Sequence, residues 1–134
     1  MRVHGIGEAR TALSVARHLG KRVTLVSAPG AAGHAGAGWW AALTATLRAE
    51  FPDMAVVAVL DCGEAPGQVL AALRAGCTDV AFSGPDDVTA RLSDIAVQAG
   101  ARIHRPIEGP LDLRGIRRTR DAVTAWLTGV PASG

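Results

Sequence analysis

The sequence predicts an α/β fold in which repeated βα units form a parallel sheet covered by helices. Two observations support this prediction. Short apolar runs without polar alternation recur along the chain, as in strands that are buried on both faces. Longer segments between them repeat apolar residues every three or four positions, which is the period of a helix. Such alternation with short connections indicates one α/β domain, expected over residues 1–128.

Four short, mainly apolar runs are the predicted strands. They cover 22–28, 55–61, 79–84 and 101–104. The second run ends on an acid and a thiol, Asp61 and Cys62. Residues at the carboxyl ends of parallel strands face the ligand crevice of such folds, so chemistry is expected there. Asp61 is either held in that crevice or caps the turn that follows it.

Five segments have the apolar pattern of helices. The first helix is expected from near Glu8 to Gly20, the second through Trp40 up to Pro52, and the third up to Gly76. The fourth is expected from Asp86 to Gly100, and the fifth over roughly 113–127. Glycine often ends a helix because it adopts a left-handed conformation readily, and proline cannot continue one. Residues 129–134 are expected to form a flexible tail.

Composition narrows the class of protein. The chain has 134 residues, of which 49% are hydrophobic and 19% charged, so one globular domain is expected. No run approaches the roughly 18 apolar residues of a membrane span, and the first residues lack the apolar core of an export signal. We therefore predict a cytoplasmic protein without a membrane partner, in which Cys62 and Cys77 are free thiols.

The charge of the chain is small but unevenly distributed. A formal charge of +2 does not predict a nucleic-acid partner. Four arginines, however, lie within seven residues on the last predicted helix: Arg114, Arg117, Arg118 and Arg120. Runs of this kind usually form a solvated helix face. The alternative is a patch that binds an anion or an acidic partner.

Repeated βα units can be arranged in two ways. They form an open flavodoxin-like three-layer sandwich, or they form part of a TIM-type (βα)8 barrel, which takes about 250 residues. A chain of 134 residues supplies half of such a barrel. A half-barrel has two open edges and an exposed apolar inner layer, which a partner normally covers. We therefore expect a homodimer or a larger homo-oligomer.

A family resemblance bears on this choice. The segment 27-SAPGAAGHAGAGWWAALTATLRAEFPDMAVVAVLDCG-63 resembles, without a gap, the second and third βα units of class II fructose-bisphosphate aldolases. The parallels are the small-residue turn at Gly30 and Ala31, the step at Ala35 and Gly36, the helix end at 50–52 and the strand that leads into an Asp-X-Gly motif at 61–63. The likeness extends more weakly over residues 5–104. It implies a barrel-type fold, of which this chain forms about half.

The resemblance also implies a site. The family has Asp-His-Gly or Asp-His-Cys at this point, where the Asp handles the proton at the aldehyde carbonyl oxygen and the His binds zinc. Here the acid is Asp61 and Cys62 replaces the histidine, and a thiolate is also able to bind zinc. The family's next zinc ligand, a glutamate, falls near His104. Its substrate-binding serine falls on Ala28, with Ser27 one position earlier.

Residues near the predicted strand ends complete the candidate site. The candidates for ligand binding are Ser27, Gly30, His34 and Ser83. The glycine-rich run 30–38 lacks the Lys-Ser or Lys-Thr pair of a P-loop, so a nucleotide is not expected. No cofactor is predicted, and zinc at Cys62 and His104 is the alternative.

Two functions follow from these residues. In the first, the chain is a catalytically degenerate half-barrel that binds a small molecule or a protein. In the second, it is a metal-dependent lyase assembled from two chains, with Asp61 as acid and base and a metal at Cys62 and His104. The family's later zinc histidine and its glycine-rich phosphate loops have no counterpart in this chain, which favours the first function. Whether the protein is an enzyme is left open.

Overall fold

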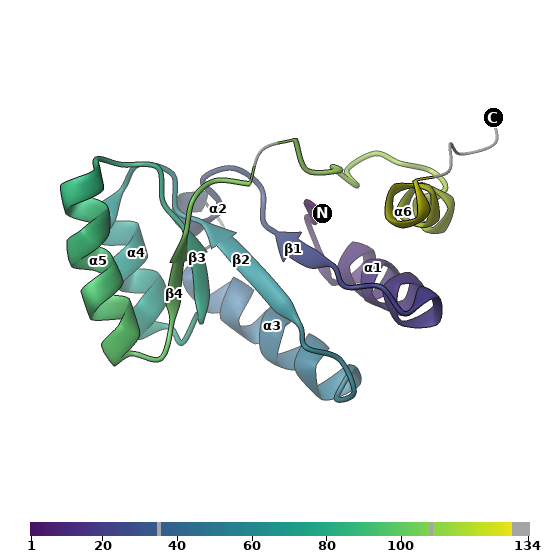
Figure 1. Cartoon of the computed structure of the whole chain (residues 1–134), viewed down its shortest axis with the longest axis horizontal. Coiled ribbons are helices and arrows are strands. Elements are labelled where there is room, and N and C mark those ends of the chain that lie inside the picture. The colour runs from purple at the N-terminus through teal and green to yellow at the C-terminus, as the bar shows by residue number, and fades with distance from the viewer. Residues whose placement is uncertain (35, 108, 130–134) are drawn as a thin grey trace.

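A computed structural model of the chain describes residues 1–34, 36–107 and 109–129. It shows an α/β fold with a parallel sheet in the order β1-β2-β3-β4 and with helices between the strands (Figure 1). The elements are α1 (Ile6–Leu19), β1 (Thr24–Val26), α2 (Ala31–His34), α3 (Ala37–Glu50), β2 (Val57–Asp61), α4 (Pro66–Arg74), β3 (Asp79–Ala81), α5 (Asp86–Gln98), β4 (Arg102–His104) and α6 (Thr119–Thr128). The predicted fold class is confirmed.

The predicted elements are present, most of them with bounds that differ from the prediction by a few residues. Each strand lies within its predicted run. The last helix begins at Thr119 and not near residue 113, because residues 111–113 pair with Arg2 instead. The amide of Arg2 donates to the carbonyl of Leu111 at 2.7 Å, and the amide of Leu113 donates to the carbonyl of Arg2 at 3.1 Å. The short helix α2 lies in the glycine-rich run, where the sequence predicts no element.

Other predictions concern the cysteines, the chain end and membranes. Cys62 and Cys77 are both free, as predicted, and both are buried. Gly129 ends α6, whereas the rest of the predicted tail, 130–134, lies outside the described residues. Every helix in the described part of the chain is too short or too polar to span a bilayer.

The strands follow one another across the sheet in the order in which they occur along the chain. In a flavodoxin-like sheet the second strand lies on one side of the first and the later strands are added on the other side, so the order of the strands across the sheet is not sequential. A barrel adds each parallel strand beside the last, as happens here. On the β1 side, Arg2 bridges both Val26 and Asp112 in parallel, which continues the pairing beyond β1. The strand order is therefore the same as that of consecutive strands in a barrel.

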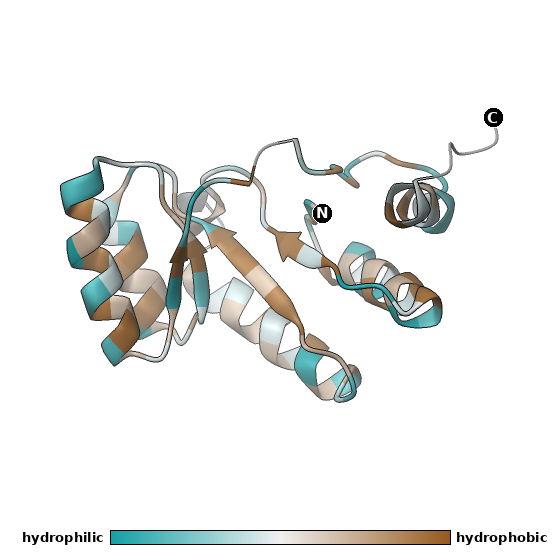
Figure 2. Ribbon diagram, viewed as in Figure 1, coloured by the Kyte–Doolittle hydropathy of each residue, from teal (hydrophilic) through white to brown (hydrophobic). Residues whose placement is uncertain are grey.

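One face of the sheet is covered by the long helices. Successive residues of a strand point to opposite faces, and Leu25, Leu60 and Val80 point to the same one. They share a core cluster with side chains of α1, α3, α4, α5 and α6, which include Leu13, Trp40, Leu47, Val69, Leu92 and Val123. Figure 2 shows β2 as a mainly apolar strand among helices of mixed polarity. The helices thus form an outer layer, as they do around a barrel.

The inner face of the sheet is also buried, and a single chain buries it. Val26, Val59 and Ala81 are 1%, 0% and 2% exposed, and Ile107 packs against the cluster that they form. Ile107 belongs to the stretch of chain between β4 and α6 (Figure 1). Residues 111–113 of the same stretch pair with Arg2. The expectation of an exposed inner layer is therefore wrong. The homo-oligomer that was inferred from it stays a prediction without that support.

Ile107 is expected to stabilise the fold by covering the inner layer. Burial of a side chain of this size contributes about 1.5–3 kcal/mol, and Ile107 is half-buried. We therefore expect Ile107→Ser to lower the free energy of unfolding by about 1–2 kcal/mol, measured by urea titration. The control is Ile95→Ser on α5, because Ile95 is 45% exposed. Equal losses in the two variants would contradict the covering role.

Candidate functional site

The register of the sheet brings Asp61 and His104 into one row at the carboxyl edge. Asp61 is opposite Ala81, and Ala81 is opposite His104, so all three point to the inner face. Neighbouring strands lie about 4.8 Å apart, which separates the Cα atoms of Asp61 and His104 by about 10 Å. Open α/β sheets bind their ligands at this edge. Two predicted site residues thus share a face.

The Asp61 carboxylate links two loops. Its Oδ1 accepts a hydrogen bond from the amide of Gly63 at 2.8 Å and another from the amide of Gly30 at 3.2 Å. Both glycines have positive φ angles, 58° and 65°, which residues with a Cβ rarely adopt. The bond to Gly63 closes a local turn, whereas no side chain caps α4 at its N-cap residue, Ala65. Asp61 therefore fixes the loop after β1 against the turn after β2.

Ser27 lies at the end of β1, and its hydroxyl has protein partners. The residue is 0% exposed. Its Oγ accepts a hydrogen bond from the amide of Asp61 at 2.9 Å and donates one to the carbonyl of Ala28 at 3.1 Å. Its carbonyl accepts a bond of 2.7 Å from the guanidinium of Arg2. These bonds join the ends of β1 and β2 to the first residues of the chain. The ligand-binding role of Ser27 stays a prediction.

Cys62 faces the helices, on the opposite side of the sheet from Asp61 and His104. It follows Asp61 directly, so its side chain points the other way, and it is 3% exposed. Burial, together with the nearby Asp61 and Cys77, raises the pKa of its thiol to about 12, so the thiol is protonated at neutral pH. The structure therefore does not bring the two predicted zinc ligands together. Among the described residues, no group of three or more His, Cys, Asp or Glu side chains is placed to hold a metal ion.

His104 has a partner that the sequence analysis missed. Its Nε2 lies 2.8 Å from Oδ1 of Asp79, a buried acid at the start of β3. The Oδ2 of Asp79 accepts a bond of 3.0 Å from the hydroxyl of Thr78, and that hydroxyl accepts a bond of 3.0 Å from Arg48. These contacts satisfy a carboxylate that would be costly to bury alone. The signal in the sequence is an acid that opens an apolar strand, since such an acid needs a partner nearby.

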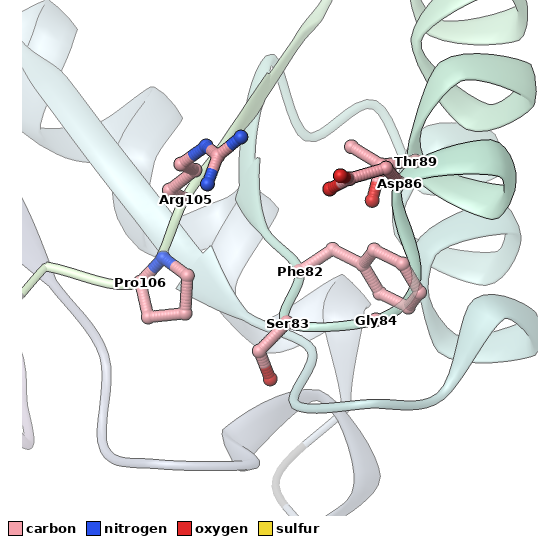
Figure 3. A pocket seen from close by; sticks show the side chains of 7 residues that line it. All are labelled: Phe82, Ser83, Gly84, Asp86, Thr89, Arg105 and Pro106. Carbon is pink, nitrogen blue, oxygen red and sulfur yellow. The ribbon is translucent and has the colours of Figure 1, made fainter.

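A pocket of about 360 Å³ lies between the carboxyl ends of β3 and β4 and the first turn of α5 (Figure 3). It is lined by Phe82, Ser83, Gly84, Asp86, Thr89, Arg105 and Pro106. Of the predicted ligand-binding residues, Ser83 lines this pocket, and its amide donates to the carbonyl of Gly63 at 2.9 Å. Gly30 lies in the loop bonded to Asp61 instead. His34 closes α2, and its side chain lies outside the described residues.

Two charged residues of this pocket were not selected from the sequence. Arg105 comes directly after β4, and Asp86 begins α5. In Figure 3 they extend from opposite walls, and neither forms an ion pair with another described residue. Phe82 and Pro106 add apolar surface, and a side chain at Gly84 would displace the Phe82 ring. The sequence offered one signal for this pair, which is the arginine directly after a predicted strand. Asp86 gave no such signal, because an acid is also common at a helix N-terminus for electrostatic reasons.

Removal of the Asp61 carboxylate is expected to destabilise the fold. Asp61→Ala leaves the amides of Gly30 and Gly63 without their acceptor, and we expect a loss of roughly 2 kcal/mol in the free energy of unfolding. Asp61→Asn should cost about 1 kcal/mol or less, because its amide oxygen still accepts both bonds without the benefit of a charge. Chemical denaturation measures both values. The exposed Asp94→Ala is the control, and unchanged stability in Asp61→Ala would show that the two bonds do not hold the loops.

Comparison with known proteins assigns no family to the chain. It matches no protein-family model and no curated protein. The relationship to class II aldolases stays an expectation from the sequence. A function is inferred from the geometry of the carboxyl edge of the sheet.

Proposed function

We propose that the chain is a catalytically degenerate, aldolase-like half-barrel that binds a small molecule in the pocket between β3, β4 and α5. The observation that supports this most is the position of the pocket at the carboxyl edge of a parallel sheet, where α/β folds bind ligands. Its volume of about 360 Å³ lies at the lower end of the range for small-molecule sites, roughly 300–1,000 Å³. A ligand the size of a small metabolite suits such a pocket.

Arg105 is the residue that we expect to hold the ligand. A guanidinium presents its N–H donors in one plane and binds a carboxylate or a phosphate through two parallel hydrogen bonds. Arg105 is exposed and has no ion-pair partner in the described ranges, so its charge is available. Phe82 and Pro106 offer apolar surface to the remainder of the ligand.

The residues that the resemblance equates with the aldolase site support a site that has lost its catalytic function. Oδ1 of Asp61 already accepts two backbone hydrogen bonds, and His104 is bonded to Asp79. Cys62 carries a protonated thiol on the other face of the sheet. Zinc bound by Cys62 and His104 does not fit this arrangement, because ligand bonds of about 2.0–2.3 Å cannot reach across a sheet. The metal-dependent lyase assembled from two chains is therefore the weaker proposal.

A protein partner is the second candidate, and the α6 end of the molecule favours it. Arg117, Arg118 and Arg120 are exposed beside a hollow of about 390 Å³ between α1 and α6, and they form no ion pairs within the described part of the chain. Trp126 of α6 is 52% exposed. Basic side chains at the start of α6 and an exposed aromatic residue later in the same helix suit an acidic protein surface, and such binding weakens with salt. A cytoplasmic location and a homo-oligomer stay predictions from the sequence.

Loss of the Arg105 charge is expected to weaken ligand binding by about tenfold or more, because a hydrogen-bonded charge contributes about 1.5–3 kcal/mol. Wild-type protein is screened against small carboxylates, phosphates, sugars and amino acids by differential scanning fluorimetry, since a ligand of the native state raises the melting temperature. Arg105→Gln should lose the response. Arg102→Gln, at the other end of β4, should keep it. The proposal fails if no compound shifts the wild type, or if Arg105→Gln responds as the wild type does.

Zinc content separates the degenerate module from the lyase. We expect protein purified without a chelator to contain little zinc and to keep its melting temperature when EDTA is added, because Cys62 and His104 lie on opposite faces. Elemental analysis by mass spectrometry measures the ratio. A ratio near one zinc per chain that is lost in Cys62→Ala, but kept in Cys77→Ala, would overturn the degenerate site and revive the lyase.

A further inference from the structure

Arg105 and Asp86 approach the pocket from separate elements. The amide of Phe82 donates to the carbonyl of His104 at 3.0 Å, so pairing continues beyond the end of β3. Because residues alternate along a strand, Arg105 points away from the inner face and toward α5. Asp86 reaches the same hollow from the first turn of α5 (Figure 3). A positive and a negative group therefore face one small space.

These two charges form no ion pair with any of the residues that the structure describes. Arg105 and Asp86 are the charged residues among those that line the pocket, and they form no ion pair with each other. The neighbouring acid, Asp87, is already paired with Arg91 on the next turn of α5, at 3.6 Å. The side chains of both residues are exposed to solvent. A ligand that enters between them meets both.

The pair of charges restricts the class of ligand. A purely anionic ligand satisfies Arg105 but is repelled by Asp86, and a purely cationic ligand has the opposite difficulty. A neutral ligand that displaces water from both groups leaves them without a charged partner. A molecule that carries a carboxylate and an ammonium group on the same carbon atom satisfies both at once.

We propose that the pocket binds a small zwitterion of the α-amino-acid type, an inference that rests on the proposed small-molecule function. The ligand carboxylate accepts hydrogen bonds from Arg105, and the ligand ammonium donates to Asp86. Thr89 lies beside Asp86, and its hydroxyl donates to the carbonyl of Pro85 at 3.0 Å, so its oxygen can still accept a bond from the ammonium group. The ligand side chain packs on Phe82 and Pro106, which favours an apolar or small side chain.

The test uses the full chain and matched probes. The twenty α-amino acids are screened by calorimetric titration, and the tightest is compared with the carboxylic acid that lacks its amine and the amine that lacks its carboxylate. We expect each analogue to bind about tenfold or more weakly than the amino acid. Asp86→Asn and Arg105→Gln should each weaken the amino acid by a similar factor, whereas Asp87→Asn should leave it unchanged. The melting temperature of each free variant shows that it is folded.

The outcomes separate this inference from the proposed function. If the carboxylic acid binds as tightly as the amino acid, and Asp86→Asn has no effect, the ligand is an anion and the zwitterion is overturned while the pocket still binds a small molecule. If sugars or phosphates bind and amino acids do not, the zwitterion is likewise overturned. If none of these compounds binds the wild type, the proposed function fails together with the inference.

Discussion

Burial of the inner face of the sheet is the constraint on which the rest of the structure depends. A parallel sheet of this kind is apolar on both sides, and the helices here cover only one of them. The segment after β4 covers the other, through contacts of Ile107 with Val26, Val59 and Ala81. The chain must therefore turn inward soon after β4 and reach Arg2 at the far side of β1. That path holds the residues after β4 at the carboxyl edge, where they form one wall of the pocket.

The carboxyl edge has a closed part and an open part. In the closed part, Asp61 and Ser27 are bonded to the loops after β1 and β2, and His104 is bonded to Asp79. These are residues at which aldolase-like chemistry was expected, and here their polar atoms hold the fold together. The open part lies beside the ends of β3 and β4, where Arg105 faces a hollow and has no ion-pair partner among the residues that the structure describes. The hydrogen-bonded part holds the strand ends beside the open part, and the open part is the one that is available to a ligand.

The strands could be predicted because continuous runs of Val, Ala and Leu suit a sheet that is buried on both faces. The site could be predicted only in part. The position of Asp61 at a strand end follows from the sequence, but its bond to Gly30, 31 residues away, depends on how β1 and β2 pair. The separation of Cys62 from His104 also depends on register, since a shift of one residue reverses every side chain of a strand. The approach of Arg105 to α5 depends on how β4 pairs with β3 and on which face of the sheet α5 covers, and neither is visible in the sequence around Arg105.

Nuclear Overhauser contacts between methyl groups test directly whether the segment after β4 covers the inner face of the sheet. They are recorded at a protein concentration at which light scattering gives the mass of one chain. If the segment after β4 covers the inner layer of its own sheet, the methyl groups of Ile107 should show contacts with those of Val26 and Val59, and these contacts should arise within a single chain. The absence of these contacts would show that the segment after β4 does not cover the inner layer, and their appearance only between differently labelled chains would show that a second copy covers it.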